Sequence, residues 1–242
     1  GYGNLQNPLA QLAYQSTNKS SDFSVWVDHS SAKSSLEDQQ NDQTSAGFSF
    51  ENMINQSQRI FVFAGYDLSN FKQYGFDHDK FTFQKSDLTQ TYNNISAGAS
   101  FTQLLGEENR TSISPEFFVK NFSNNKSVVE FSGNAKVVVK HQLSAKFGVD
   151  FAPQINLVSY KKELDSSRLY NLTQLPLNIS YLSKKFKFEG GVNIAFYKSK
   201  LTFAPNLNIS YKLGSSDVKL RAQVRNDFSI NSFNSCKLLI IR

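Results

Sequence analysis

The chain has 242 residues, of which 39% are hydrophobic and 19% are charged. It is therefore too apolar for a disordered protein, and it is long enough to form one large all-β unit. The formal net charge of +6 comes from lysine and arginine spread along the whole sequence, which argues against a nucleic-acid partner and for solvated turns or a hydrated interior. Cys236 is the only cysteine, so no intrachain disulfide can form, and no stretch approaches the ~20 apolar residues of a membrane helix.

Apolar and polar residues alternate with a period of two along almost the entire chain, as expected of strands with one apolar and one polar face. Near the middle of the chain, for example, Phe147, Val149 and Phe151 share one face, whereas Gly148 and Asp150 share the other. In chain order, the alternation predicts about thirteen strands, at 8–17, 22–34, 45–55, 58–69, 89–103, 111–120, 126–140, 142–152, 154–162, 169–182, 186–197, 200–211 and 218–230. These segments reach the ~9–11 residues of a membrane-crossing strand, whereas globular strands average about 5–6.

The predicted connections fall into two classes of length. Short ones lie at 18–21, 55–58, 141, 183–185 and 212–217, and longer ones lie at 35–44, 70–88 and 163–168. The connections at 104–110 and 198–199 fit this division less well. Outer-membrane barrels alternate short periplasmic turns with longer outer loops. The sequence therefore predicts an all-β fold, an antiparallel transmembrane β-barrel with about 12–14 strands present.

Three places depart from simple alternation. Strand 58–69 is apolar on both faces, which suggests a covered inner face; Trp26 falls on the predicted lumen side; and residues 153–169 alternate poorly.

We interpret residues 1–242 as a single β-barrel region. An odd strand number, and a first strand that runs from the outer side toward the periplasm, predict a fragment that lacks upstream strands and any plug domain. Residues 235–242 lose the alternation, which predicts a truncated, altered or continuing end.

Three short segments resemble a known family. Gly1–Asn4, Val27–Ser31 and Tyr74–Asp77 are similar to segments of TonB-dependent-receptor-like outer-membrane proteins of Bacteroidota, best over residues 1–150. The resemblance implies a bacterial outer-membrane location, a full barrel of up to 22 strands, an N-terminal plug and energy-coupling partners. No plug or TonB-box-like segment is recognisable in this sequence, so energised import is implied only if those parts precede Gly1.

Charged residues on the polar face of the predicted strands are the candidates for lining the lumen. Charged residues in two of the long connections are the candidates for outer-loop contacts. The lumen candidates are Lys146, Asp150, Lys187, Glu189, Lys219, Arg221 and Arg225. The outer-loop candidates are Glu37, Asp38, Asp77, His78 and Asp79. The basic ridge of Lys219, Arg221 and Arg225 suits anion attraction, although ordinary lumen lining is the better interpretation.

Chemical motifs are scarce. Asp77-His78-Asp79 is the most metal-like group, but adjacent side chains rarely converge on one ion, so a solvated loop is favoured. No Gly-x-Ser-x-Gly elbow, phosphate loop, Cys-x-x-Cys pair or dinucleotide fingerprint is present. The sequence thus predicts no enzymatic activity, no cofactor and no metal.

Three functions remain open. The first is an outer-membrane barrel that passes or takes up a solute or polypeptide through a polar lumen. The second is a structural or interaction barrel within a larger outer-membrane assembly. The third is a soluble secreted β-sandwich or adhesin, which needs a second sheet to cover the first.

Overall fold

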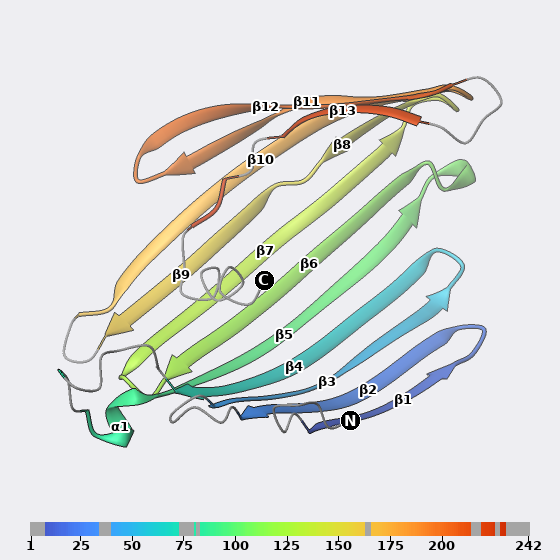
Figure 1. Ribbon diagram of the computed structural model, residues 1–242. Coiled ribbons are helices and arrows are strands. Elements are labelled where there is room, and N and C mark those ends of the chain that lie inside the picture. The colour runs from blue at the N-terminus through green and yellow to red at the C-terminus, as the bar shows by residue number, and fades with distance from the viewer. Residues whose placement is uncertain are drawn as a thin grey trace.

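The computed structural model describes residues 8–33, 40–72, 80, 83–162, 166–213, 219–225 and 228–230, and these form one antiparallel sheet (Figure 1). The strands are β1 (Leu9–Thr17), β2 (Ser21–Lys33), β3 (Gln40–Asn55), β4 (Gln58–Lys72), β5 (Thr89–Leu105), β6 (Thr111–Asn124), β7 (Val128–Gln142), β8 (Phe147–Phe151), β9 (Gln154–Lys162), β10 (Arg168–Leu182), β11 (Phe186–Tyr197), β12 (Lys200–Lys212) and β13 (Lys219–Arg225). The short helix α1 (Lys85–Leu88) precedes β5, and a 3₁₀ turn, η1 (Glu107–Asn109), follows it. The predicted all-β fold with about thirteen strands is confirmed.

Each strand pairs with its neighbours in the sequence, except at β8 and β9. Both of these strands pair with β7 on one side and with β10 on the other, so they lie end to end. Pro153 lies at the junction and has no N–H for the ladder. Its carbonyl still accepts the N–H of Val137 at 3.0 Å, and Ala152 donates to the carbonyl of Pro176 at 3.1 Å, which keeps the three strands together.

This junction explains the weak alternation after residue 152 and changes the strand count. The thirteen strands occupy twelve positions across the sheet, because β8 and β9 share one position. The sequence suggested an odd number of strands, but the described strands would cross the membrane twelve times, which is an even number. The prediction that upstream strands exist remains a prediction.

Several strands are longer than the alternation predicted. β3 begins at Gln40 rather than 45, because Asn41 pairs in register with Ala32 and continues the ladder through polar residues. β6 likewise runs on to Asn124. β8, in contrast, starts only at Phe147, and residues 143–146 form the preceding turn.

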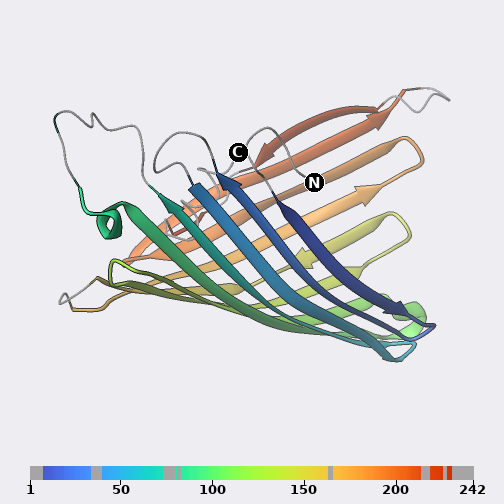
Figure 2. The ribbon, with the colours of Figure 1, turned by 60° about the horizontal axis from the view of Figure 1, so that its bottom comes forward.

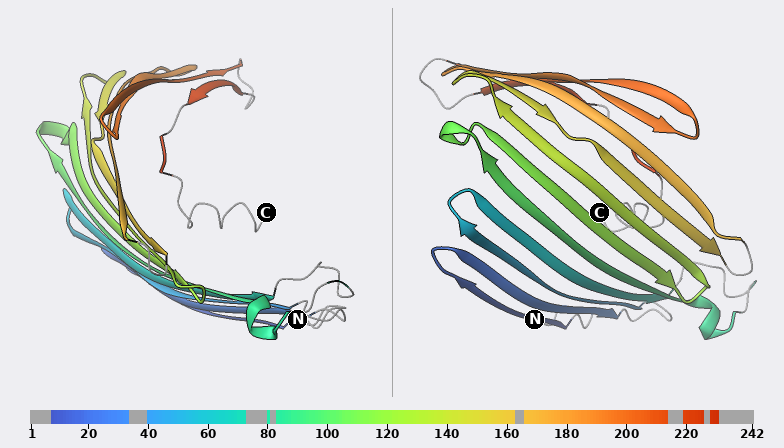
Figure 3. Two further views of the ribbon diagram at one scale, coloured as in Figure 1. Left: turned by 90° about the vertical axis from the view of Figure 1, so that its left-hand side faces the viewer. Right: turned by 180° about the vertical axis from the view of Figure 1, so that it is seen from behind.

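The sheet curves into a trough with a convex and a concave face (Figure 3). The connection that contains α1 lies at one end of the strands, together with the β6–β7 and β11–β12 hairpins, and the β1–β2 and β3–β4 hairpins lie at the other end (Figure 2). The curvature follows from the right-handed twist of long antiparallel strands, and it is the shape of a barrel wall.

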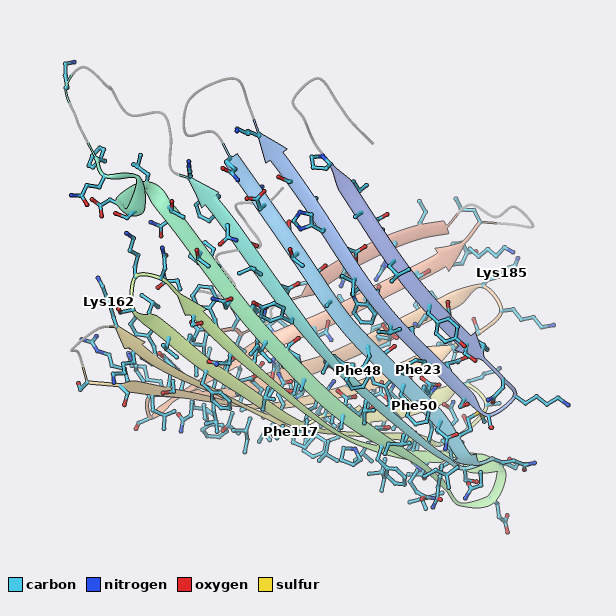
Figure 4. The ribbon with its side chains drawn as sticks, turned by 90° about the horizontal axis from the view of Figure 1, so that it is seen from below. Phe23, Phe48, Phe50, Phe117, Lys162 and Lys185 are labelled. Carbon is cyan, nitrogen blue, oxygen red and sulfur yellow. The ribbon has the colours of Figure 1, made fainter. Side chains whose placement is uncertain are left out.

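Alternation gives the two faces opposite chemistry. Large apolar side chains stay exposed on the convex face, with Phe23, Phe48, Phe50 and Phe117 among them. Figure 4 labels these four phenylalanines on β2, β3 and β6, with Lys162 and Lys185 near opposite ends of the sheet. The concave face carries mostly Ser, Thr, Asn, Gln and charged residues, with an aromatic patch that β4 shares with its neighbours.

No helix among the described residues is long and apolar enough to cross a membrane.

Candidate functional site

A pocket of about 490 Å³ lies on the concave face near one edge of the described sheet. Side chains from β7 and from β9 through β13 surround it. The lining residues are Lys136, Ala152, Gln154, Gln174, Pro176, Asn178, Glu189, Val192, Asn193, Asn206, Asn208, Arg221, Gln223 and Phe228. Strand register explains the gathering, because residues paired across antiparallel strands point to the same face.

Seven of these lining residues are asparagine or glutamine, and their carboxamides bond to each other across the strands. Asn193 Nδ2 donates to Gln174 Oε1 at 2.8 Å, and Asn206 Nδ2 donates to Asn178 Oδ1 at 3.0 Å. A neighbouring bond of the same kind joins Asn134 to Asn156 at 2.7 Å. Each carboxamide has both donors and acceptors, so this wall suits a neutral polar ligand.

The charges in the pocket have partners. Glu189 accepts from Lys187 Nζ at 2.8 Å and from Asn208 Nδ2 at 2.7 Å. Arg221 Nε donates to Asn208 Oδ1 at 3.2 Å. Lys136 Nζ lies 3.5 Å from Glu116 Oε2. The wall therefore carries both signs and presents no strong field of one sign.

Gln174 and Asn193 are the most enclosed polar side chains of the pocket. Gln174 is 3% exposed and Asn193 is 8% exposed, and Asn193 Oδ1 has no hydrogen-bond partner among the described residues. A buried carbonyl oxygen without a donor costs about 1–3 kcal/mol. A donor that reached this oxygen would remove that cost.

Gln174 also contacts a segment beyond the sheet. Its Nε2 donates to the backbone carbonyl of Phe228 at 3.3 Å. Residues 228–230 thus lie on the concave side of the sheet, beside the pocket (Figure 3).

A second feature of the concave face is an aromatic patch formed by Phe61, Phe63 and Phe118, and Trp26 of β2 lies on the same face beside Gly47. The rings of Phe63 and Phe118 are stacked with centroids 5.8 Å apart, and Phe61 lies 5.8 Å from Phe63.

Phe63 of this patch and Trp26 lie over glycines. A Cβ built on Gly98 would come within 2.5 Å of Phe63, and one on Gly47 within 2.5 Å of Trp26. These glycines leave room for the rings to lie flat on the sheet, so the inward positions that the sequence indicated for Trp26 and for strand 58–69 are those observed.

Six of the seven predicted lumen residues lie on the concave face. Five of them belong to β11 and β13: Lys187, Glu189, Arg221 and the backbone positions of Lys219 and Arg225. Asp150 pairs with Lys140 and with Asn178, which lines the pocket.

Lys146 lies elsewhere, in the turn that precedes β8, because this strand starts later than the alternation indicated. Glu37, Asp38, Asp77, His78 and Asp79 lie outside the described residues.

The candidate-site residues that the sequence did not indicate are the carboxamides. The predicted lumen residues are all charged, whereas Gln174 and Asn193 are neutral. Their parity was the available signal, since Asn193 alternates with Val192 and Ile194 on β11. Gln174 also contacts Phe228, and the alternation placed this residue in a strand at 218–230, whereas β13 ends at Arg225 and residues 228–230 are not strand.

No group of three or more metal-ligating side chains occurs within the described part of the chain. His29 Nδ1 is 2.8 Å from Thr44 Oγ1, and His141 Nδ1 is 2.8 Å from Thr111 Oγ1, so each bonds to a hydroxyl across a strand pair.

Neither protein families nor curated proteins yield a match to this sequence. Solved structures do. The siderophore receptor PirA from Pseudomonas aeruginosa superposes with a TM-score of 0.65 at 10% identity over 86% of this chain. The ferripyoverdine receptor of the outer membrane of Pseudomonas aeruginosa superposes with a TM-score of 0.59 at 8% identity over 87% of this chain. The structure of the FpvAI–pyocin S2 complex superposes with a TM-score of 0.57 at 9% identity over 88% of this chain.

These likenesses show the fold: the sheet has the architecture of an outer-membrane β-barrel wall. This chain spans 39%, 39% and 40% of the three matched chains, respectively. Two of the three matched proteins are named as receptors. Their source is Pseudomonas where an organism is stated, so the predicted assignment to Bacteroidota has no support from them.

Proposed function

We propose that this chain forms part of the wall of a bacterial outer-membrane barrel that takes up a polar solute or polypeptide through its lumen. The observation that carries the proposal is the opposite chemistry of the two faces of one sheet. The convex face exposes Phe, Leu, Ile and Val, as contact with lipid requires. The concave face holds a pocket lined by carboxamides and paired charges, as a wet lumen requires.

The structural neighbours support the same class of function. They include receptors for a siderophore and for ferripyoverdine, and one that is in complex with pyocin S2. A full barrel with upstream strands, a plug and energy-coupling partners is part of this proposal. The connections between β2 and β3 and between β4 and β5, which are shorter than the predicted 35–44 and 70–88, would then select the ligand.

Entry of solutes into liposomes tests the proposal. The full-length protein is reconstituted, and entry of arabinose and of triglycine is compared with entry into protein-free liposomes. We expect faster entry with the protein, and slower entry after Asn206→Trp, which places a large ring in the wall pocket. Equal rates with and without protein would refute passage through the lumen.

The aromatic patch favours a second candidate, an interaction barrel within a larger outer-membrane assembly. Phe61, Phe63 and Phe118 form an apolar surface on the concave face, where a water-filled lumen needs none. Purification of the native protein in mild detergent tests this candidate, since a stable partner would copurify and Phe63→Ser would release it.

A β-sandwich, the third candidate, needs two sheets, and the described strands form one.

A further inference from the structure

The Gln174–Asn193 pair has hydrogen-bonding groups that one peptide unit would complete. We propose that this pair is a binding site for the backbone of an extended polypeptide, and that residues 228–230 of the chain occupy its Gln174 side in cis. The inference rests on the proposed function and deepens it, because it names a polypeptide as the class of ligand that the lumen receives.

The donors and acceptors of the pair are complementary to a peptide backbone. Gln174 Nε2 already donates to a backbone carbonyl, that of Phe228, at 3.3 Å. Asn193 Oδ1 is buried and lacks a donor among the described residues. An extended peptide offers a carbonyl to the first group and an N–H to the second. The bond from Asn193 Nδ2 to Gln174 Oε1 holds the two carboxamides in one orientation.

The surrounding charges favour a neutral ligand. Glu189 is paired with Lys187, and Lys136 lies beside Glu116. Arg221 is engaged by Asn208, whose amide also bonds to Glu189. An anionic ligand would have to displace these partners, whereas a peptide backbone bonds to the uncharged pair without disturbing them.

The segment at 228–230 is a ligand supplied by the chain itself. Phe228 contributes both its carbonyl, bonded to Gln174, and a place in the pocket lining. A polypeptide entering from outside must therefore compete with this segment. Loosening the segment should expose the pair and strengthen binding of an added peptide.

Calorimetric titration of the full-length protein in detergent tests the inference. The probe is the tripeptide Phe-Ser-Ile, acetylated and amidated, which copies residues 228–230 without charge. Phe228→Gly loosens the segment and is expected to bind the probe several-fold more tightly than the parent protein. Adding Gln174→Met, which keeps the length of the side chain but loses its donor, should weaken binding to Phe228→Gly about 3- to 10-fold.

Gln43→Met is the matched control, because Gln43 lies on the concave parity of β3, paired with Ser30 and Ser69 and away from the pocket. It should leave probe affinity unchanged. Equal affinity in Phe228→Gly with and without Gln174→Met would overturn the binding site. Equal affinity in the parent and Phe228→Gly would overturn occupation in cis.

Maltotriose serves as the competing probe. If it binds in a Gln174-dependent manner and the peptide does not, the site recognises a sugar and the inference is wrong. The titration is independent of transport, so failed liposome entry with retained peptide binding would refute passage alone.

Discussion

Phe117 and Phe118 are consecutive residues of β6 with opposite surroundings. Phe117 is 56% exposed on the convex face, whereas the ring of Phe118 stacks on Phe63 of β4 on the concave face. One peptide bond therefore separates the proposed lipid side of the wall from its lumen side.

This pair gives a direct test of which face meets lipid. Phe117→Trp and Phe118→Trp each add one indole, and the quenching of the added fluorescence by brominated lipid acyl chains is measured in the reconstituted full-length protein. We expect strong quenching of the indole at 117 and little at 118. Equal quenching of both would contradict a barrel wall with the convex side in lipid.

A charge placed on each face should have unequal costs. Val137 and Val138 are adjacent in β7, near its middle; Val137 is 39% exposed on the convex face, and Val138 pairs with Ser114 on the concave face. Val137→Arg should lower the free energy of unfolding by about 2–4 kcal/mol, because arginine is costly near the bilayer midplane. Val138→Arg should cost less, although Lys136 and Lys140 share its face.

Urea unfolding in lipid vesicles measures both variants. Equal losses would show that the two faces have similar environments, which would refute the membrane orientation.

The glycine under Phe63 should be intolerant of substitution. The Cβ of Gly98→Ala would meet Phe63 Cε1 at 2.5 Å and the carbonyl oxygen of Phe117 at 3.0 Å. Overpacking of this kind costs about 1–3 kcal/mol. Gly133→Ala is the control, since the nearest atom to its Cβ is 3.9 Å away. Thermal unfolding should therefore separate the two variants, and a similar melting temperature for both would show that Phe63 moves aside freely.

Alternation was sufficient to predict the strands and the faces, because a period of two is imposed by the backbone itself. It failed where another rule operates. Pro153 joins β8 and β9 into one crossing, a relationship that only the pairing of both strands with β7 reveals.

The candidate site was less predictable than the fold. Glu189 and Arg221 were found as charges on the polar parity. Gln174 and Asn193 were missed because their importance comes from burial and from an unpaired oxygen, and these depend on which strands and segments surround them.

The charge of the wall should set ion preference if the barrel conducts. Among the described residues that line the pocket, Glu189 is the only acidic one, beside the basic Lys136 and Arg221. Glu189→Gln keeps an oxygen for Asn208 but removes the negative partner of Lys187, which lies 2.8 Å away. The pocket wall then carries a larger positive excess, and charged groups that line a pore select ions of opposite sign. The reversal potential in a planar bilayer under a KCl gradient should shift toward the chloride equilibrium potential, most strongly at low salt, where screening is weakest.

Glu108→Gln is the control. The Glu108 carboxylate lies in the η1 turn, outside the pocket, where it is 74% exposed and pairs with Arg110. Its removal should leave the reversal potential unchanged. An equal shift in both variants would mean that the pocket charges do not face the conducting path.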